Sequence, residues 1–312
     1  MCARDECVFD GRRTLIIVLL IVFPCIVIGQ SDDVESDQSV VRRLLGPYYP
    51  KNRVRVDARR YPWSAVGRIT LFDTVLRPGG ATSCSGILVG ENLVLTAAHC
   101  VWSRRDYPEE VFFLAGIQQN KYVAHSNAKN IYIHEAFESG EPSPKKFSID
   151  WALIELEKPI GKTTGYVGVA VFDAGVLESM NKERVRFKVS GYRGDRLFVQ
   201  TVDHDCRIDG FAGDDELILH RCPITRGDSG GPLLLPIQGE LLVVGIDVGL
   251  LGLEVEVDGK QRIVGFGVAV PSSRFRGKLK ELGVDMGPMK GPSEIVGRLG
   301  WNPKASKGSL AE

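Results

Sequence analysis

The stretch Arg226-Gly-Asp-Ser-Gly-Gly-Pro232, followed at once by Leu233-Leu-Leu235, decides the fold of this 312-residue sequence. A serine hydroxyl becomes a useful nucleophile only when a base takes its proton and donors bind the oxyanion that forms. The glycines around Ser229 allow the backbone N–H groups of Gly227 and Ser229 to converge on the carbonyl oxygen of a bound ester or amide. Taken alone, such a stretch is also compatible with an ordinary turn.

A candidate base lies in Leu93-Val-Leu-Thr-Ala-Ala-His-Cys100, which predicts an apolar strand ending in small residues, a histidine and a cysteine. A disulfide between Cys100 and Cys84 would close a loop of about 16 residues, contribute about 3 kcal/mol and fix His99. Without a partner motif, a histidine at a strand end is more often a structural polar residue.

A carboxylate that can orient this histidine is Asp150, at the start of the apolar run Trp151-Ala-Leu-Ile-Glu-Leu156. Burial of an unpaired carboxylate is costly, and an imidazole Nδ1–H is a natural donor to it. The alternative for Asp150 alone is a turn residue at a strand start. Because His99, Asp150 and Ser229 occur together in that order, we predict that they form one catalytic triad.

The composition predicts an all-β protein, because 35 glycines and many short Val/Ile/Leu runs are typical of strands joined by tight turns. An amphipathic helix is expected over 273–282. The 39 basic and 39 acidic residues balance, which argues against a nucleic-acid partner. Strands are expected over 65–71, 85–89, 93–97, 111–116, 130–134, 151–156, 185–190, 217–219, 233–235, 241–247 and 261–270.

The N-terminus has the pattern of an export signal, in which Arg12 and Arg13 precede an apolar run from Leu15 to Ile28. The run is shorter than the about 20 residues of a membrane span, so no stable membrane association is expected after cleavage. A protein tethered by an uncleaved first segment is the alternative. We predict a signal peptide over 1–29, a pro-segment or N-terminal arm over 30–53, a folded domain over 54–283 and a flexible tail over 284–312.

The cysteine count agrees with export. Three of the seven cysteines lie in the segment expected to be removed, and the remaining four can pair without a remainder. After Cys84 and Cys100, the other available pair is Cys206 and Cys222. We therefore predict an extracellular or periplasmic protein.

The motifs ending at Cys100, beginning at Asp150 and surrounding Ser229 together resemble the chymotrypsin/trypsin family of serine proteases, over about residues 61–282. The resemblance implies two six-stranded antiparallel β-barrels with the site between them. It also implies hydrolysis of polypeptides through an acyl-enzyme, without a cofactor: Ser229 attacks, His99 shuttles the proton and Asp150 supports the imidazolium.

Several residues depart from the usual pattern of this family and indicate to which of its branches the sequence is most similar. Trypsin-like animal enzymes usually carry a cysteine where Thr225 stands, and the segment from Cys206 to Cys222 looks more like bacterial glutamyl endopeptidases. In the substrate pocket, Pro223 replaces the aspartate by which trypsin selects Arg or Lys, and Ile224 stands where glutamyl endopeptidases often have a hydroxyl. Asp247 falls near the histidine by which those relatives hold glutamate. We expect Asp247 either to favour a basic side chain before the scissile bond or to hydrogen-bond to backbone.

The sequence also contains a candidate activation site and an acidic stretch that bears on metal binding. In many relatives, a new N-terminus made by cleavage pairs with the aspartate before the nucleophile, here Asp228, and Arg42-Arg43 is a candidate cleavage site. Dibasic pairs are also common in solvated arms. The acidic stretch 203–216 lacks the ligand spacing of a calcium loop and no zinc spacing occurs, so no metal site is predicted. His134 is expected to be structural; His125, His204 and His220 are expected in loops.

The sequence thus predicts a secreted serine endopeptidase. The alternative is a catalytically silent, protease-shaped binding protein. Such proteins usually lose a member of the triad, whereas His99, Asp150 and Ser229 are all present.

Overall fold

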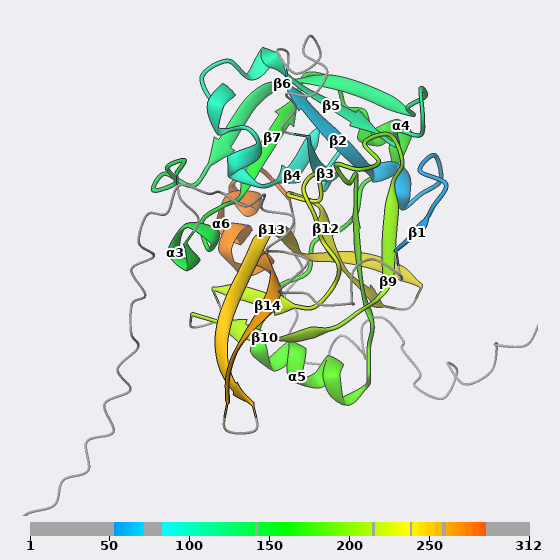
Figure 1. The fold of residues 1–312 in the computed structure, drawn as a ribbon. Coiled ribbons are helices and arrows are strands. Elements are labelled where there is room, and N and C mark those ends of the chain that lie inside the picture. Colours follow the sequence, from blue (N-terminus) through cyan, green and yellow to red (C-terminus); the bar gives the residue numbers. More distant parts are fainter. Residues whose placement is uncertain are drawn as a thin grey trace, which may run out of the picture. The chain divides into compact units, whose positions relative to one another are not determined.

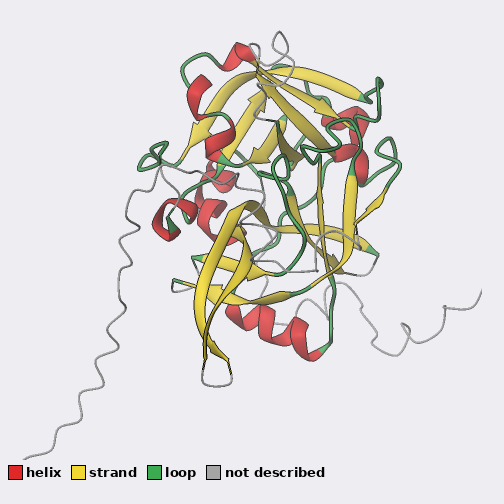
Figure 2. Ribbon diagram, in the orientation of Figure 1, coloured by secondary structure: helices red, strands yellow, loops and turns green. Residues whose placement is uncertain are grey.

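The computed structural model describes residues 53–71, 83–140, 143–213, 216–237, 239–257 and 260–284. The predicted signal peptide, the candidate cleavage site after Arg43 and the predicted tail beyond Val284 lie outside the described residues and stay predictions. Strands dominate the described part, and its helices are short (Figure 2). None of the described helices combines the length and the apolar character needed to cross a membrane.

The first half of the described chain forms a closed six-stranded barrel (Figure 1). Its strands follow the order β2-β3-β4-β7-β6-β5, and each pair is antiparallel. Their bounds are β2 Val66–Leu71, β3 Cys84–Leu88, β4 Leu93–Thr96, β5 Val111–Ala115, β6 Ala124–Ile133 and β7 Ala152–Leu156. Thr96 on β4 lies opposite Ala152 on β7, so the segment after β4 and the segment before β7 meet at one end of the barrel.

Seven strands from the second half of the described chain and β1 from its beginning form an eight-stranded antiparallel sheet in the order β1-β9-β8-β12-β13-β14-β11-β10. The bounds are β1 Arg53–Arg55, β8 Phe187–Gly191, β9 Thr201–Cys206, β10 Ile208–Ala212, β11 Leu217–His220, β12 Pro232–Ile237, β13 Glu240–Val257 and β14 Lys260–Pro271. The predicted all-β class is confirmed. The second sheet extends beyond six strands because β1 pairs with β9 and β10 pairs with β11.

The short helices cover parts of the two sheets. Their bounds are α3 Pro144–Phe147, α4 Gly161–Thr164, α5 Ala174–Lys182 and α6 Ser272–Glu281, with 3₁₀ turns at Trp63–Ala65, Ala98–Cys100, Trp102–Arg104 and Pro108–Glu110. The predicted helix over 273–282 is confirmed as α6. Phe275 and Leu279 on α6 are fully buried in the same apolar cluster as the first barrel, and the Phe275 ring lies 6.2 Å from that of Trp151. The C-terminal helix therefore closes one side of the core.

Replacing Phe275 tests this packing. Phe275→Ala is expected to lower the free energy of unfolding by about 3–5 kcal/mol, because it opens a cavity between α6 and the barrel. Urea unfolding followed by tryptophan fluorescence measures the change, since Trp151 is adjacent. The neighbouring exposed position supplies the control: Arg276→Ala should shift the free energy by less than about 0.5 kcal/mol. Equal unfolding midpoints for the two variants would contradict the packing.

Candidate active site

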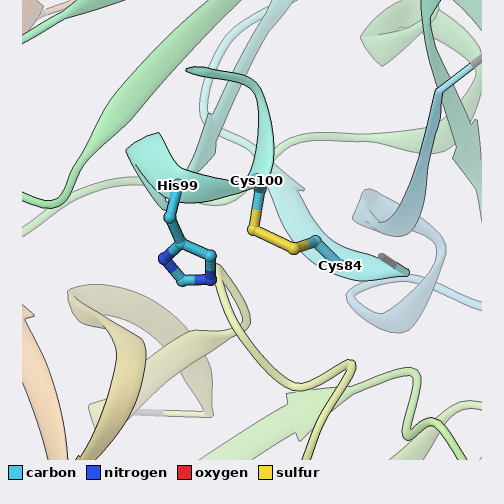
Figure 3. Close-up of side chains that lie close together, drawn as sticks. All are labelled: Cys84, His99 and Cys100. Carbon is cyan, nitrogen blue, oxygen red and sulfur yellow. A yellow bond between two sulfur atoms is a disulfide. The ribbon is translucent and has the colours of Figure 1, made fainter. Parts of the chain in front are cut away.

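His99 lies on the 3₁₀ turn Ala98–Cys100, directly after β4. The small residues Ala97 and Ala98 are fully buried, so the turn packs closely against the barrel. The predicted disulfide between Cys100 and Cys84 is present and ties the turn to the start of β3, next to the imidazole (Figure 3). About a third of the His99 side chain, 36%, remains exposed. The histidine is therefore fixed at its backbone and still accessible to a substrate.

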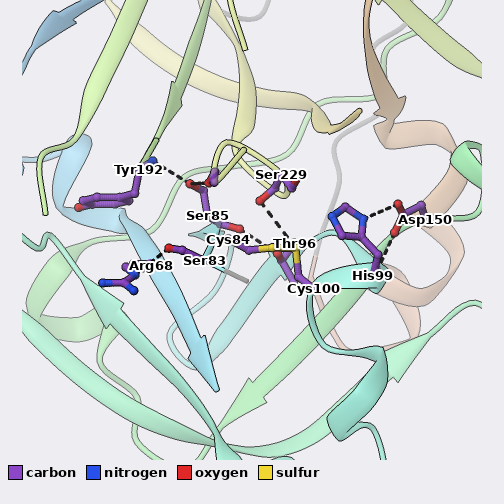
Figure 4. Close-up of a disulfide and its surroundings, with 11 residues drawn as sticks. Arg68, Ser83, Cys84, Ser85, Thr96, His99, Cys100, Asp150, Tyr192 and Ser229 are labelled. Carbon is purple, nitrogen blue, oxygen red and sulfur yellow. Dashed lines mark hydrogen bonds and ion pairs between the residues drawn. A yellow bond between two sulfur atoms is a disulfide. The ribbon is translucent and has the colours of Figure 1, made fainter. Parts of the chain in front are cut away.

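Asp150 approaches His99 from the segment between α3 and β7. Its Oδ2 lies 2.6 Å from Nδ1 of His99, and its Oδ1 accepts the backbone N–H of His99 at 2.9 Å (Figure 4). The carboxylate is 6% exposed, so water competes little for these contacts. A carboxylate bound at Nδ1 keeps the proton on that nitrogen. Nε2 is left to accept a proton from another group.

Ser229 lies in the loop that leads into β12. Its carbonyl accepts the N–H of Ser85 at 2.8 Å and lies 3.8 Å from Sγ of Cys100. Figure 4 shows Ser229 beside the imidazole of His99, on the side opposite Asp150. Within the described part of the chain, the Ser229 hydroxyl forms no hydrogen bond with His99. Such contacts are often long without substrate and tighten when it binds.

The backbone of this loop turns two N–H groups in a defined direction. The carbonyl of Arg226 accepts the N–H of Gly194 at 2.6 Å, and the carbonyl of Asp228 accepts that of Gly231 at 2.7 Å. In a trans peptide the N–H points away from the carbonyl, so the N–H groups of Gly227 and Ser229 point away from these two contacts. Among the described residues, no backbone carbonyl accepts either N–H group. Both are available for an oxyanion.

Gly227 is required for this loop shape. Its φ is +92°, in a region that side chains rarely adopt, and a Cβ there would collide with the backbone of Tyr192 and Gly194. Its carbonyl accepts the hydroxyl of Ser85 at 2.7 Å, and the same hydroxyl accepts the N–H of Tyr192 at 2.8 Å. Ser85 was not singled out from the sequence, because a serine inside an apolar strand has no pattern that distinguishes it.

The residues predicted for the substrate pocket are all in buried surroundings. The Ile224 side chain is 5% exposed within the apolar cluster of the second sheet, and the Pro223 carbonyl accepts a hydrogen bond from Arg53 at 3.0 Å. Oδ1 of Asp247 lies 2.8 Å from Nε2 of His220, and both side chains are at most 1% exposed. Nδ1 of His220 accepts the N–H of Cys222 at 3.2 Å. Nε2 therefore carries the ring proton and donates a hydrogen bond to Oδ1 of Asp247.

The loop assignment of three histidines was wrong. His125 and His204 lie on β6 and β9, where polar residues interrupt the apolar pattern that would reveal a strand. His220 is the last residue of β11, which extends the strand predicted over 217–219 by one position. His134 directly follows β6. His220 is the one with chemical consequences, because it forms the partner of Asp247.

The described acidic residues of the stretch 203–216 lie on β9, on β10 and just before β11, and three of them pair with arginines. Asp205 pairs with Arg186, Asp209 with Arg221 and Glu216 with Arg274. Across the described residues, the clusters of three or more His, Cys, Asp or Glu side chains close enough to share an ion are Cys84, His99 and Cys100, and Cys206, His220 and Cys222. The cysteines in both clusters form disulfides, so they have no thiolate that could bind a metal ion.

Arg53 is the main residue that sequence reasoning missed. Its Nη2 lies 2.9 Å from Oδ1 of Asp228, and both side chains are 1% exposed. Burial raises the pKa of Asp228 to about 6, while Arg53 and the N–H of Thr225 oppose this shift. Nothing in the short, charged stretch around Arg53, which lies far before the nucleophile in sequence, would indicate such a contact; β1 brings Arg53 there by pairing with β9.

A barrel and a sheet that position a His–Asp pair beside a Gly-flanked serine define the architecture of a serine hydrolase. The trypsin family model matches residues 56–276, and the chain therefore belongs to the trypsin family. Of the three candidate residues, His99 and Asp150 come from the first barrel, and Ser229 comes from the loop before β12.

Individual relatives support the predicted branch. Glutamyl endopeptidase of Bacillus licheniformis is 26% identical over 149 residues, which are 46% of this chain and 41% of that protein. Complement factor I of Mus musculus is 29% identical over 104 residues, 33% of this chain and 15% of that protein. This chain thus spans less than half the length of either curated relative. A solved structure of Glu endopeptidase in complex with MPD shares the fold, with a TM-score of 0.54 and 20% identity over 76% of this chain and 98% of that one.

Removal of the Ser85 hydroxyl tests how the serine loop is held. Ser85→Ala leaves the Gly227 carbonyl and the Tyr192 N–H without their partner, and each buried group left unpaired is expected to cost about 1–3 kcal/mol. Thermal and urea unfolding measure the loss. Ser103→Ala, at an exposed position in the first barrel, is the control and should be neutral. A Ser85→Ala protein as stable as this control would show that the hydroxyl does not hold the loop.

Proposed function

We propose that this chain is an exported serine endopeptidase that cleaves peptide bonds through an acyl-enzyme intermediate. The observation that carries the proposal is the 2.6 Å contact between Nδ1 of His99 and Asp150. This contact leaves Nε2 of an accessible imidazole free to act as a base next to the Ser229 loop. Family membership supports the same reaction.

In the proposed mechanism, Nε2 of His99 takes the proton of Ser229 Oγ while Oγ bonds to the substrate carbonyl carbon. The C=O electron pair moves to the oxygen, which accepts hydrogen bonds from the N–H groups of Gly227 and Ser229. The C–N bond then breaks, and His99 gives its proton to the leaving amine. Water repeats these steps on the acyl group and regenerates Ser229. Asp150 stabilises the imidazolium in both halves.

Export is supported by two independent features. The Arg-flanked apolar start has the pattern of a cleaved signal, and disulfides join Cys84 to Cys100 and Cys206 to Cys222. Disulfides persist mainly in oxidising compartments outside the cytosol.

Labelling with a fluorophosphonate tests the reaction. The mature protein should label at Ser229, Ser229→Ala should not, and Asp150→Asn should lower kcat on peptide substrates by about 10⁴-fold because the histidine loses its oriented tautomer. Failure of folded, disulfide-bonded protein to label would favour the silent binding protein instead. Labelling without cleavage of any peptide in a diverse panel would indicate an esterase.

For the substrate residue before the scissile bond, we propose a basic side chain. Oδ1 of Asp247 is bound to His220, but Oδ2 has no hydrogen-bond partner within the described chain. A buried carboxylate oxygen without a donor is costly, and a guanidinium or ammonium from the substrate would supply the donor.

A peptide panel that varies only this substrate residue tests the preference. Asp247→Asn keeps the shape and an acceptor for His220, and is expected to lower kcat/KM for Arg and Lys substrates by about tenfold or more relative to neutral ones. Asp209→Asn, on the surface of β10, is the control and should leave the profile unchanged. A basic preference that survives Asp247→Asn, or a wild-type preference for Glu, would show the hypothesis to be wrong.

A further inference from the structure

The carboxylate next to the nucleophile is neutralised by an arginine that lies far from it in sequence. Asp228 and Arg53 form an ion pair at 2.9 Å, with both side chains almost completely buried. Removal of two charges from water is unfavourable unless each finds partners. A pair of this kind is therefore a strong constraint on the backbone segments that carry it.

Arg53 is fixed by more than its charge. Nε donates to Oγ1 of Thr201 at 3.1 Å, Nη2 donates to the Thr201 carbonyl at 3.0 Å, and Nη1 donates to the Pro223 carbonyl at 3.0 Å. Thr201 belongs to β9, and Pro223 begins the segment that leads into the serine loop. The planar guanidinium thus joins strand β9, this segment and Asp228 at one point, which the compact ammonium of a lysine cannot do equally well.

Asp228 transmits this constraint to the oxyanion donors. Its Oδ2 accepts the N–H of Thr225 at 2.9 Å, and its backbone N–H donates to the Thr225 carbonyl at 3.0 Å. Its own carbonyl accepts the N–H of Gly231, and this contact sets the direction of the Ser229 N–H. The orientation of an oxyanion donor therefore depends on where the Asp228 side chain is held.

We propose that Arg53 is a positioning residue, the internal cation that holds Asp228 and keeps the Gly227 and Ser229 N–H groups in their oxyanion-binding orientation. This inference rests on the proposed function. In many relatives a new chain terminus fills that role, whereas here a side chain on β1 fills it. Cleavage after Arg43 is consequently not required to form the oxyanion site.

Four variants of the full chain test the proposal by fluorophosphonate labelling rate and by kcat and KM on an ester substrate. Arg53→Met should lower kcat and the labelling rate by about 100-fold with KM little changed, as expected for loss of an oxyanion donor. Arg53→Lys should recover part of the rate. Arg55→Met, an exposed neighbour on the same strand, and Arg42→Gln/Arg43→Gln, which blocks the candidate cleavage, should match the wild type.

The outcomes separate the inference from the proposed function. A folded Arg53→Met protein with wild-type kcat, or a loss of activity confined to Arg42→Gln/Arg43→Gln, would overturn the inference alone. A wild-type protein that never labels would overturn the proposed function and the inference with it. If Arg53→Met does not fold, Arg53→Met/Asp228→Asn removes both buried charges; it should fold and still label about 100-fold more slowly. Wild-type labelling by this double variant would also overturn the inference.

Discussion

Ser85 is the point at which the first barrel holds the serine loop. Its N–H donates to the Ser229 carbonyl, its hydroxyl donates to the Gly227 carbonyl, and its own carbonyl accepts the hydroxyl of Thr96. The preceding residue, Cys84, is bonded to Cys100 beside His99. Two consecutive residues of β3 thus locate both the base and the nucleophile. The distance between His99 and Ser229 is therefore set by the backbone of β3, and the closely packed closed barrel keeps that backbone rigid.

Much of the fold and of the candidate site could be predicted from the sequence. The strands of the barrel carry long apolar runs because they are buried, so Leu93-Val-Leu95 and Ala152-Leu-Ile154 were recognisable without any partner information. His99 follows the first of these runs, and Asp150 precedes the second. Because β4 and β7 are antiparallel neighbours, the contact between these two residues follows from the pairing of the strands.

Other parts of the site depend on contacts that no local pattern encodes. β1 and β9 mix charged and apolar residues irregularly, and their charged side chains find partners outside these two strands: Arg53 pairs with Asp228, and Asp205 pairs with Arg186. His220 gave no sign of burial because its partner, Asp247, lies on a different strand and is 27 positions away. A buried pair of polar residues can be recognised only when both members are seen together, since each alone has the composition of a surface loop.

The position of β1 at the edge of the second sheet also affects how the protein loses its activity. β1 has only three residues and lies at the edge of the sheet, so few backbone hydrogen bonds hold it, and the contacts of Arg53 with Asp228, Thr201 and Pro223 supply much of its attachment. The loop beside the nucleophile takes its counter-ion from this short edge strand. Conditions that break the contacts of Arg53 can therefore detach β1 while the barrel and the rest of the second sheet remain folded. In this enzyme, inactivation would then precede global unfolding, and a stability measured on the barrel would overstate the range of conditions in which the catalytic loop keeps its shape.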